Sequence, residues 1–204
     1  MGQSLMRRLQ TGMSLVEVMI GLAIMGILLG IGVPSMSTWL MNAQVRTMSE
    51  TLLQGLNLAR AEAVRRNGLV RFQLVSDLTA SCAVSTGGVD WVVSLADPAG
   101  LCAAAPSETT APQTLQKKAG NEGSPKAAVT ATTAGVITFN ALGRPSSSTV
   151  NMTQIDITNP TFSPCQHATP AGETRCMRVL ITTGGTVKLC DPKVTDATDP
   201  RICS

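Results

Sequence analysis

Residues 12–33 read GMSLVEVMIGLAIMGILLGIGV, and this stretch decides how the chain is built. Arg7 and Arg8 precede it, and Glu17 is the only charged residue within it. An ordinary secretory signal is cut after its apolar core. Here the candidate cleavage position, after Gly12, comes before the apolar run. Processing at this position would leave the run on the mature chain, where it becomes a working part of the protein.

The apolar run is long enough to cross a bilayer, because about 20 residues of helix span the hydrocarbon core. The arginines before it predict that the N-terminal side stays in the cytoplasm and that the C-terminal part faces away from it. A carboxylate inside hydrocarbon is costly, so Glu17 is interpreted as functional. The alternative is that Glu17 lies near the end of the helix, at the level of the lipid headgroups, and is simply solvated there.

Residues 35–66 keep a helical period, which predicts one long helix over 13–66 that ends at Asn67-Gly68. Pro34 is expected to kink this helix or to melt the turn before it. The predicted apolar stripe consists of Met36, Leu40, Ala43, Met48, Leu52, Leu56, Ala59 and Ala63. We expect this stripe to pack on a globular head.

After residue 68 the pattern changes to short β-rich runs between Gly, Pro, Ser and Thr clusters. The predicted fold class is therefore α+β, a long N-terminal helix packed on an antiparallel β-sheet head. Residues 182–185 are expected to form a hairpin turn, and residues 97–127 a long, partly mobile surface excursion. The predicted strands are Leu69–Val75, Val89–Leu95, Val136–Asn140, Val150–Thr158, Met177–Thr182 and Thr186–Leu189.

All six cysteines follow the apolar segment, and an even number in an exported domain predicts disulfides. Six cysteines allow 15 pairings. We favour the sequential one, which joins Cys82 to Cys102, Cys165 to Cys176 and Cys190 to Cys203. The competing interpretation is a metal site made of Cys165, His167, Cys176 and Cys190, although its spacing lacks paired CxxC motifs.

Charge and composition offer little support for catalysis or for nucleic-acid binding. The formal charge is +3. Residues 1–12 hold two of the 16 basic residues and none of the 13 acidic ones, so a chain without them carries +1. Aromatic residues make up 2% of the chain, which leaves few stacking surfaces for bases. His167 is the only histidine and lies in a Pro/Thr-rich stretch. We expect no enzyme activity and no cofactor.

The N-terminal motif resembles the class III leader of type IV pilins and type II secretion pseudopilins. The resemblance implies that a prepilin peptidase cuts between Gly12 and Met13 and methylates Met13. Glu17 then corresponds to the fifth-position glutamate of the mature chain and Pro34 to its proline at position 22. In this family the first mature residue is usually phenylalanine, whereas here it is methionine. The implied partner of Glu17 is the methylated amine of Met13, of its own or of a neighbouring subunit.

Three further segments are similar to the GspH/FimT branch of this family: residues 58–72, residues 136–144 and the ending 185–203. The resemblance implies four parts: a cleaved leader (1–12), a transmembrane assembly helix (13–34), its amphipathic continuation (35–68) and a β-rich periplasmic or extracellular head (69–204). It implies a minor pilin of the inner membrane that assembles with other major and minor pilins in a type IV pilus. The alternative is a pseudopilin of type II secretion.

A third alternative is a DNA-binding minor pilin of natural transformation. Some FimT-like pilins bind DNA through a C-terminal Gly-Arg-x-Arg turn, and the matching positions here are residues 185–188, of which only Lys188 is basic. The candidate DNA contacts are Arg175, Arg178, Lys188, Lys193 and Arg201. The competing interpretation is that these residues are scattered solubilising charges.

Overall fold

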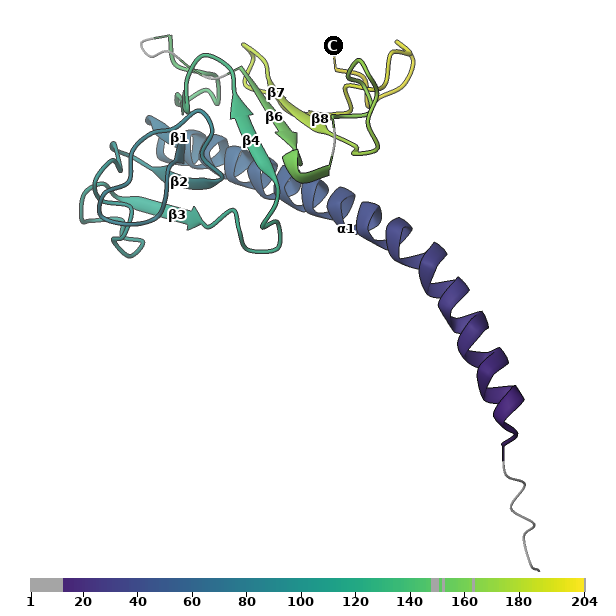
Figure 1. Ribbon diagram of the computed structural model, residues 1–204. Helices are drawn as coiled ribbons and strands as arrows, with labels where there is room; N and C mark the ends of the chain where they lie inside the picture. The colour runs from purple at the N-terminus through teal and green to yellow at the C-terminus, as the bar shows by residue number, and fades with distance from the viewer. Residues whose placement is uncertain (1–12, 148–150, 152, 163, 204) are drawn as a thin grey trace, which may run out of the picture. The chain divides into compact units, whose positions relative to one another are not determined.

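The computed structural model describes residues 13–147, 151, 153–162 and 164–203 (Figure 1). The chain forms two compact units, Met1–Ser37 and Thr38–Ser204. One long helix, α1 (Leu15–Arg66), begins in the first unit and continues into the second. Everything after α1 belongs to the second unit, the head, and is built of short antiparallel strands. The α+β architecture expected from the sequence is therefore confirmed.

The two ends of α1 follow from local capping. Ser14 precedes the first turn, and its Oγ accepts a hydrogen bond from the backbone N–H of Glu17 at 3.3 Å, as an N-cap does. At the other end, Asn67 has a φ of 50° and its N–H donates to the carbonyl of Val64, while the N–H of Gly68 donates to the carbonyl of Ala63. These two bonds satisfy carbonyls of the last turn.

α1 is continuous through residue 34. The local melting that the sequence suggested at this proline therefore does not occur. A proline in a helix interior removes one backbone hydrogen bond, and the turns on either side of it continue the helix. The side chains of residues 31–35 lie outside the described part of the chain.

Two four-stranded antiparallel sheets make the head. The first has the order β3-β2-β1-β5 and the second the order β4-β6-β7-β8. The first sheet consists of β1 (Val70–Val75), β2 (Asp90–Ser94), β3 (Thr114–Lys118) and β5 (Val136–Phe139), and the second of β4 (Ala128–Ala131), β6 (Gln154–Thr158), β7 (Met177–Ile181) and β8 (Val187–Cys190). A short 3-10 turn, Pro160–Phe162, follows β6. Six of the eight strands lie within the predicted runs or extend one residue beyond them.

The expected surface excursion at residues 97–127 is wrong as a description of this segment, because it contains β3. β3 pairs with β2 through Gln116 opposite Val93 and Lys117 opposite Val92. The Nζ of Lys117 also donates to the carbonyl of Cys102 at 2.7 Å, and the Oγ of Ser124 donates to the carbonyl of Gln44 on α1 at 2.9 Å. Long-range hydrogen bonds, which local composition does not reveal, therefore hold the segment on the head.

The main core lies between the C-terminal half of α1 and both sheets. It contains Val45, Met48, Leu52, Leu56, Ala59 and Ala63 of α1, together with Phe72, Trp91, Phe139, Ile155, Ile157 and Val179 of the strands. Each fully buried aliphatic or aromatic side chain contributes about 1.5–3 kcal/mol relative to exposure. This packing against both sheets is the principal force that holds the helix on the head.

The N-terminal part of the predicted apolar stripe is wrong. Met36 and Leu40 are 56% and 45% exposed, whereas Met41 and Val45 are buried. The predicted stripe residues from Met48 to Ala63 are all buried, which confirms this part of the stripe. Two different faces of this part of the helix carry apolar residues, one with Met36 and Leu40 and the other with Met41 and Val45. The helical period alone therefore does not decide which face the head covers.

A second, smaller core covers the other face of the first sheet. It contains Val75, Val92 and the disulfide between Cys82 and Cys102, with Leu78 packed against it. This explains why β1 is buried on both faces, since Phe72 and Leu74 point into the main core and Val75 points into the smaller one.

The expected hairpin turn at residues 182–185 is present between β7 and β8. The N–H of Thr186 donates to the Oγ1 of Thr182 at 3.1 Å, and the N–H of Gly185 donates to the carbonyl of Thr182 at 2.9 Å. Gly185 has a φ of 84°, and a Cβ there would lie 1.8 Å from the carbonyl oxygen of Gly143. Only glycine fits this close approach of two turns.

Candidate functional site

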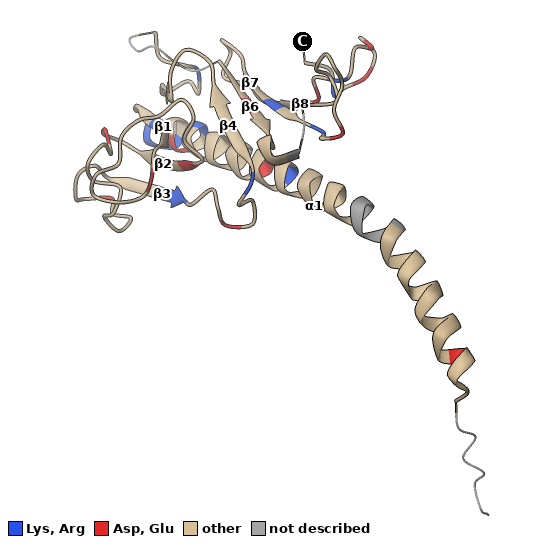
Figure 2. Cartoon of the chain, in the orientation of Figure 1, with Lys and Arg blue, Asp and Glu red and all other residues tan. Residues whose placement is uncertain are grey.

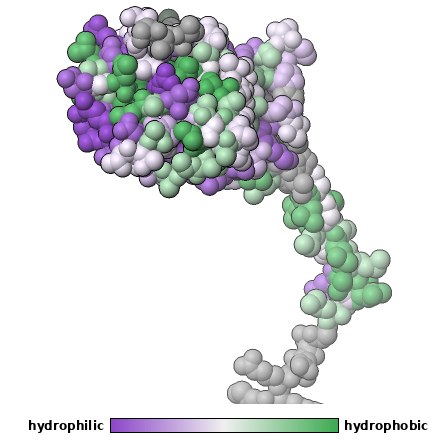
Figure 3. Space-filling view, turned by 90° about the vertical axis from the view of Figure 1, so that its left-hand side faces the viewer, coloured by the Kyte–Doolittle hydropathy of each residue, from purple (hydrophilic) through white to green (hydrophobic). Residues whose placement is uncertain are grey.

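The N-terminal part of α1 has a predominantly apolar surface, as Figure 3 shows. Its large side chains are 44–81% exposed, namely Met13, Leu15, Val16, Val18, Met19, Ile20, Leu22, Ile24, Met25, Ile27, Leu28 and Leu29. An exposed apolar surface of this extent marks a site of interaction. Within the described part of the chain, no helix meets the combined requirement of length and apolar character for crossing a membrane.

Glu17 interrupts this apolar surface in the first turn of α1. Glu17 is the only charged residue between Met13 and Arg46, and Figure 2 shows the start of the helix as tan with a red acidic position. A negative charge in the first turn interacts favourably with the helix dipole. The carboxylate is exposed and accepts no hydrogen bond from any described residue, so it is available to a positive group outside this chain.

The other predicted residues of this segment are only partly described. Met13 is 81% exposed, whereas Gly12 lies outside the described residues. A Cβ placed on Gly21, Gly26 or Gly30 would have no atom within 4 Å. Such positions allow another helix to approach closely.

Ion pairs engage the three arginines proposed as DNA contacts. Arg175 donates to Asp191 at 2.7 Å. Arg178 donates to Asp156 and Arg201 to Asp199, both at 2.6 Å, so the three arginines form three separate ion pairs. The hydrogen bonds from Arg201 lower the pKa of Asp199 to about 2, so this pair stays charged at neutral pH. Each pair has no net charge, which removes most of the positive potential that a phosphate backbone requires.

The two candidate lysines do not restore that potential. Lys193 donates to the Oε1 of Gln166 at 3.2 Å, and Lys188 lies on β8 without an ion pair among the described residues. The structure therefore does not bring the five residues together as one basic patch. Arg175 and Arg201 both line one groove, but each is paired with a carboxylate, which favours the competing interpretation of solubilising charges.

The disulfides join Cys82 to Cys102, Cys165 to Cys176 and Cys190 to Cys203, which is the pairing favoured from the sequence. The alternative metal site is therefore wrong, because its three cysteines are oxidised and have no thiolate to offer. No cluster of metal-binding side chains occurs among the described residues. His167 is exposed on its loop.

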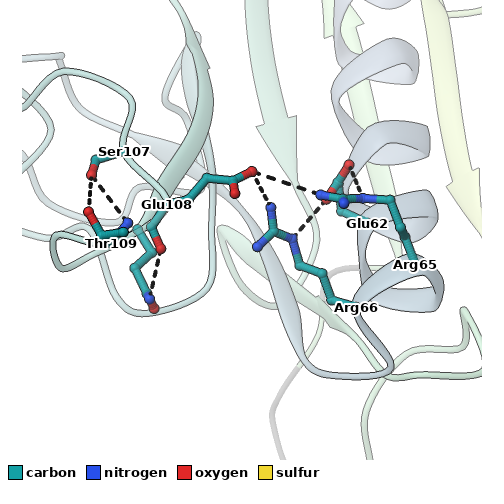
Figure 4. Close-up of polar contacts among 7 residues, drawn as sticks. Glu62, Arg65, Arg66, Ser107, Glu108 and Thr109 are labelled. Atoms are coloured by element: carbon teal, nitrogen blue, oxygen red, sulfur yellow. Dashed lines mark hydrogen bonds and ion pairs between the residues drawn. The ribbon is translucent and has the colours of Figure 1, made fainter.

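A cluster of charges at the C-terminal end of α1 was not foreseen (Figure 4). Glu62 accepts from Arg65 at 2.6 Å and from Arg66 at 2.8 Å, and Arg66 also donates to Glu108 at 2.7 Å. Hydrogen bonds from Arg65 and then Arg66 hold the pKa of Glu62 below its usual value. The cluster ties the loop before β3 to the helix. The spacing of Glu62 and Arg66 was visible in the sequence, but the partner 42 residues further on was not.

A groove at the other end of the head was also not foreseen. It has a volume of about 680 Å³ and lies between the first head turns of α1 and the segment around β7, β8 and the C-terminal loop. Trp39, Asn42, Ala43, Arg46, Glu50, Arg175, Met177, Leu189, Cys190, Asp191 and Arg201 line it. The helix spacing of Arg46 and Glu50 predicts their ion pair, but no sequence signal joins them to the C-terminal loop.

Comparison with known proteins places these features in one family. The family model of the type II transport protein GspH matches residues 49–185, and the prokaryotic N-terminal methylation motif matches residues 7–33. Two crystal structures of the type IV minor pilin FimU from Pseudomonas aeruginosa PAO1 are similar to the chain. The first is 16% identical to this chain, covers 71% of this chain and 90% of the FimU chain, and has a TM-score of 0.44. The second is 15% identical, covers 71% of this chain and 87% of the FimU chain, and has a TM-score of 0.42. No curated protein matches the sequence.

Proposed function

This chain belongs to the family of the type II transport protein GspH, and we propose that it is a minor pilin, a non-enzymatic structural subunit for the assembly of a type IV pilus. The family and the N-terminal methylation motif make it a structural subunit of the pilin and pseudopilin type. The preference for a pilus over a secretion pseudopilus rests on the three disulfides of the head, because an exposed tip gains most from such cross-links. Assembly by helix packing rests on the surface of α1. The N-terminal part of α1 exposes a continuous apolar surface with a single carboxylate, the kind of surface that other helices cover.

In this proposal residues 1–12 are removed by a prepilin peptidase, which cuts after Gly12, and Met13 is methylated. Residues 13–34 hold the chain in the inner membrane, residues 35–68 continue the helix, and residues 69–204 form the head on the periplasmic side. During assembly the apolar helix leaves the lipid and packs among the helices of other pilin-type subunits.

Glu17 guides this step in the proposal. Its carboxylate pairs with the positively charged N-terminal amine of an adjacent subunit, because an unpaired charge in an apolar helix bundle is costly. Glu17→Gln keeps the shape of the side chain and removes the charge, so we expect reduced incorporation into filaments. Glu122→Gln is the matched control, since among the described residues that carboxylate pairs only with Lys118 on the head surface. Equal incorporation of both variants would exclude this role.

A pseudopilin of type II secretion is the second candidate, and the description of the matched family favours it. Two measurements on one culture of a strain that lacks the chain distinguish the two candidate functions. Pili sheared from the surface and the secreted proteins in the medium are measured together. Lost pili with normal secretion supports the minor pilin, whereas normal pili with lost secretion supports the pseudopilin. Normal levels of both would contradict the proposed function.

A further inference from the structure

The groove of about 680 Å³ on the head has the size of pockets that bind ligands. One wall comes from the first head turns of α1 and carries Trp39 and Arg46, while Met177 and Leu189 come from β7 and β8. Arg201 lies in the C-terminal loop. These residues are far apart in the sequence and meet only in the folded head, so the groove is a product of the tertiary structure.

The groove exposes three arginines, each of which is paired with one carboxylate; the partner of Arg201 is Asp199, which is 22% exposed. The side chains of Arg46, Arg175 and Arg201 are 77%, 45% and 59% exposed. Of the two carboxylates in the lining, Glu50 is 47% exposed, whereas Asp191 is 4% exposed and bound to Arg175. The guanidinium groups therefore face solvent, while one of the two negative charges does not.

Arg46 also retains hydrogen-bonding capacity, whereas Arg175 and Arg201 each use Nε and a terminal nitrogen for their carboxylate partners. Arg46 uses its Nε for Glu50, and among the described residues its terminal nitrogens have no hydrogen-bond partner. A guanidinium carries five N–H donors in a geometry that matches a carboxylate. An acidic side chain that enters the groove can therefore bind without displacing the ion pair that is already present.

The groove also has an apolar lining, so a ligand that fits it needs an apolar group as well as a carboxylate. Trp39 is 63% exposed. Met177 and Leu189 are half-buried and pack on the main core, which keeps them in place. Tryptophan and arginine are enriched among the residues that dominate binding at protein interfaces. The ligand that fits this lining presents an apolar side chain beside a carboxylate, as a segment of protein does.

We propose that this groove binds an acidic segment of a neighbouring, different pilin-type subunit. A carboxylate of that segment lies between Arg46 and Arg201, and an apolar side chain next to it packs on Trp39 and Leu189. The inference rests on the proposed function, because it needs a partner subunit in the same assembly. It adds the contact site and the chemistry of the partner.

A second copy of this chain fits the groove less well, because most of its own carboxylates are already engaged. Among the described residues, every acidic side chain except Glu17 and Glu173 accepts a hydrogen bond. These carboxylates belong to Glu50, Glu62, Asp77, Asp90, Asp97, Glu108, Glu122, Asp156, Asp191, Asp196 and Asp199.

Site-specific cross-linking in cells tests the proposal on the full-length chain. A photoreactive amino acid replaces Trp39, and in a control strain it replaces Val64, which is 52% exposed at the far end of α1. We expect the probe at position 39 to capture a different subunit that carries an N-terminal methylation motif, with an aspartate or glutamate in the cross-linked peptide. Capture of a second copy, of lipid only, or of the same partner in equal yield from position 64 would overturn the proposal.

Charge reversal tests the role of the arginines. Arg46→Glu together with Arg201→Glu should lower the yield of the cross-link by about tenfold or more, because like charges then face each other. Arg65→Glu is the matched control, since Arg65 is 61% exposed and pairs with a glutamate of α1 as Arg46 does. Lysine in place of the captured carboxylate should restore the yield. An unchanged yield in the double variant would overturn the proposal, while loss of pili in the deletion strain would still support the proposed function.

Discussion

Replacing Gly55 by alanine tests how α1 packs on the head. A Cβ at this position would lie 2.8 Å from the Cε2 of Phe72 and 3.0 Å from two ring carbons of Trp91. Both aromatic residues are buried, and their ring centroids are 5.6 Å apart. The rings are enclosed by the main core and cannot swing away as an exposed side chain would. The alanine methyl group therefore requires a shift of the helix or of the aromatic pair.

Two opposing effects set the size of the change. In a helix interior, alanine is favoured over glycine by about 1 kcal/mol. Inserting an extra carbon into a well-packed core costs about 1–3 kcal/mol. Since the contacts are shorter than van der Waals distance, we expect the packing cost to exceed the helix gain and to lower the free energy of unfolding by up to about 2 kcal/mol. Gly55→Val adds two further carbons and should cost more.

Denaturant titration of the purified full-length chain in detergent measures this difference, with near-UV circular dichroism as the signal of aromatic packing. Gly26→Ala is the matched control, because a Cβ there has no atom within 4 Å. We expect no loss of head stability in this control. An increase of about 1 kcal/mol for Gly55→Ala, the full helix-propensity gain, would refute the packing argument.

Three further predictions concern the stability of the head. Replacing both Cys82 and Cys102 by serine opens a loop closed over 20 residues and should lower the free energy of unfolding by about 3 kcal/mol in denaturant titration. Because folding lowers the pKa of Glu62, its ionised carboxylate stabilises the fold at pH values above its ordinary pKa of 4.5. This stability is lost as the pH falls through the lowered pKa of the folded chain. Glu62→Gln should therefore flatten the pH dependence of the melting temperature in that acidic range. Arg175→Ala leaves the carboxylate of Asp191, which is 4% exposed, without its cation, and should lower the free energy of unfolding by about 1.5–3 kcal/mol in the same titration. Arg46→Ala is the control: its partner Glu50 is 47% exposed, so the loss should be less than about 0.5 kcal/mol.

Much of the fold was predictable because its signals are local. The C-terminal limit of α1 follows from Asn67-Gly68, and six strands follow from β-rich runs between turn residues. The two missed strands, β3 and β4, are short segments in or next to a region rich in Pro, Ala, Ser and Thr. Their neighbours in the sheets come from distant parts of the chain, so composition did not reveal them.

The residues of the candidate site also divide into those that local sequence predicts and those that only the folded chain reveals. The position of Glu17 in an apolar run is a local feature, and it was recognised from the sequence. The groove and the link between Arg66 and Glu108 require residues that only the tertiary structure brings together. For the same reason, the basic residues near the C-terminus looked like a possible patch. Their carboxylate partners include Asp156 on the neighbouring strand β6, which the sequence order does not place beside them.

The mass of the mature N-terminus tests the account most directly. No lysine or arginine occurs between residue 13 and Arg46, so trypsin releases residues 13–46 of the processed chain as one peptide. The account predicts that this peptide, taken from the membrane fraction of cells, begins at Met13 and carries one methyl group on its amine. A chain that retains residues 1–12, or one that is cut after the apolar run, would contradict the account.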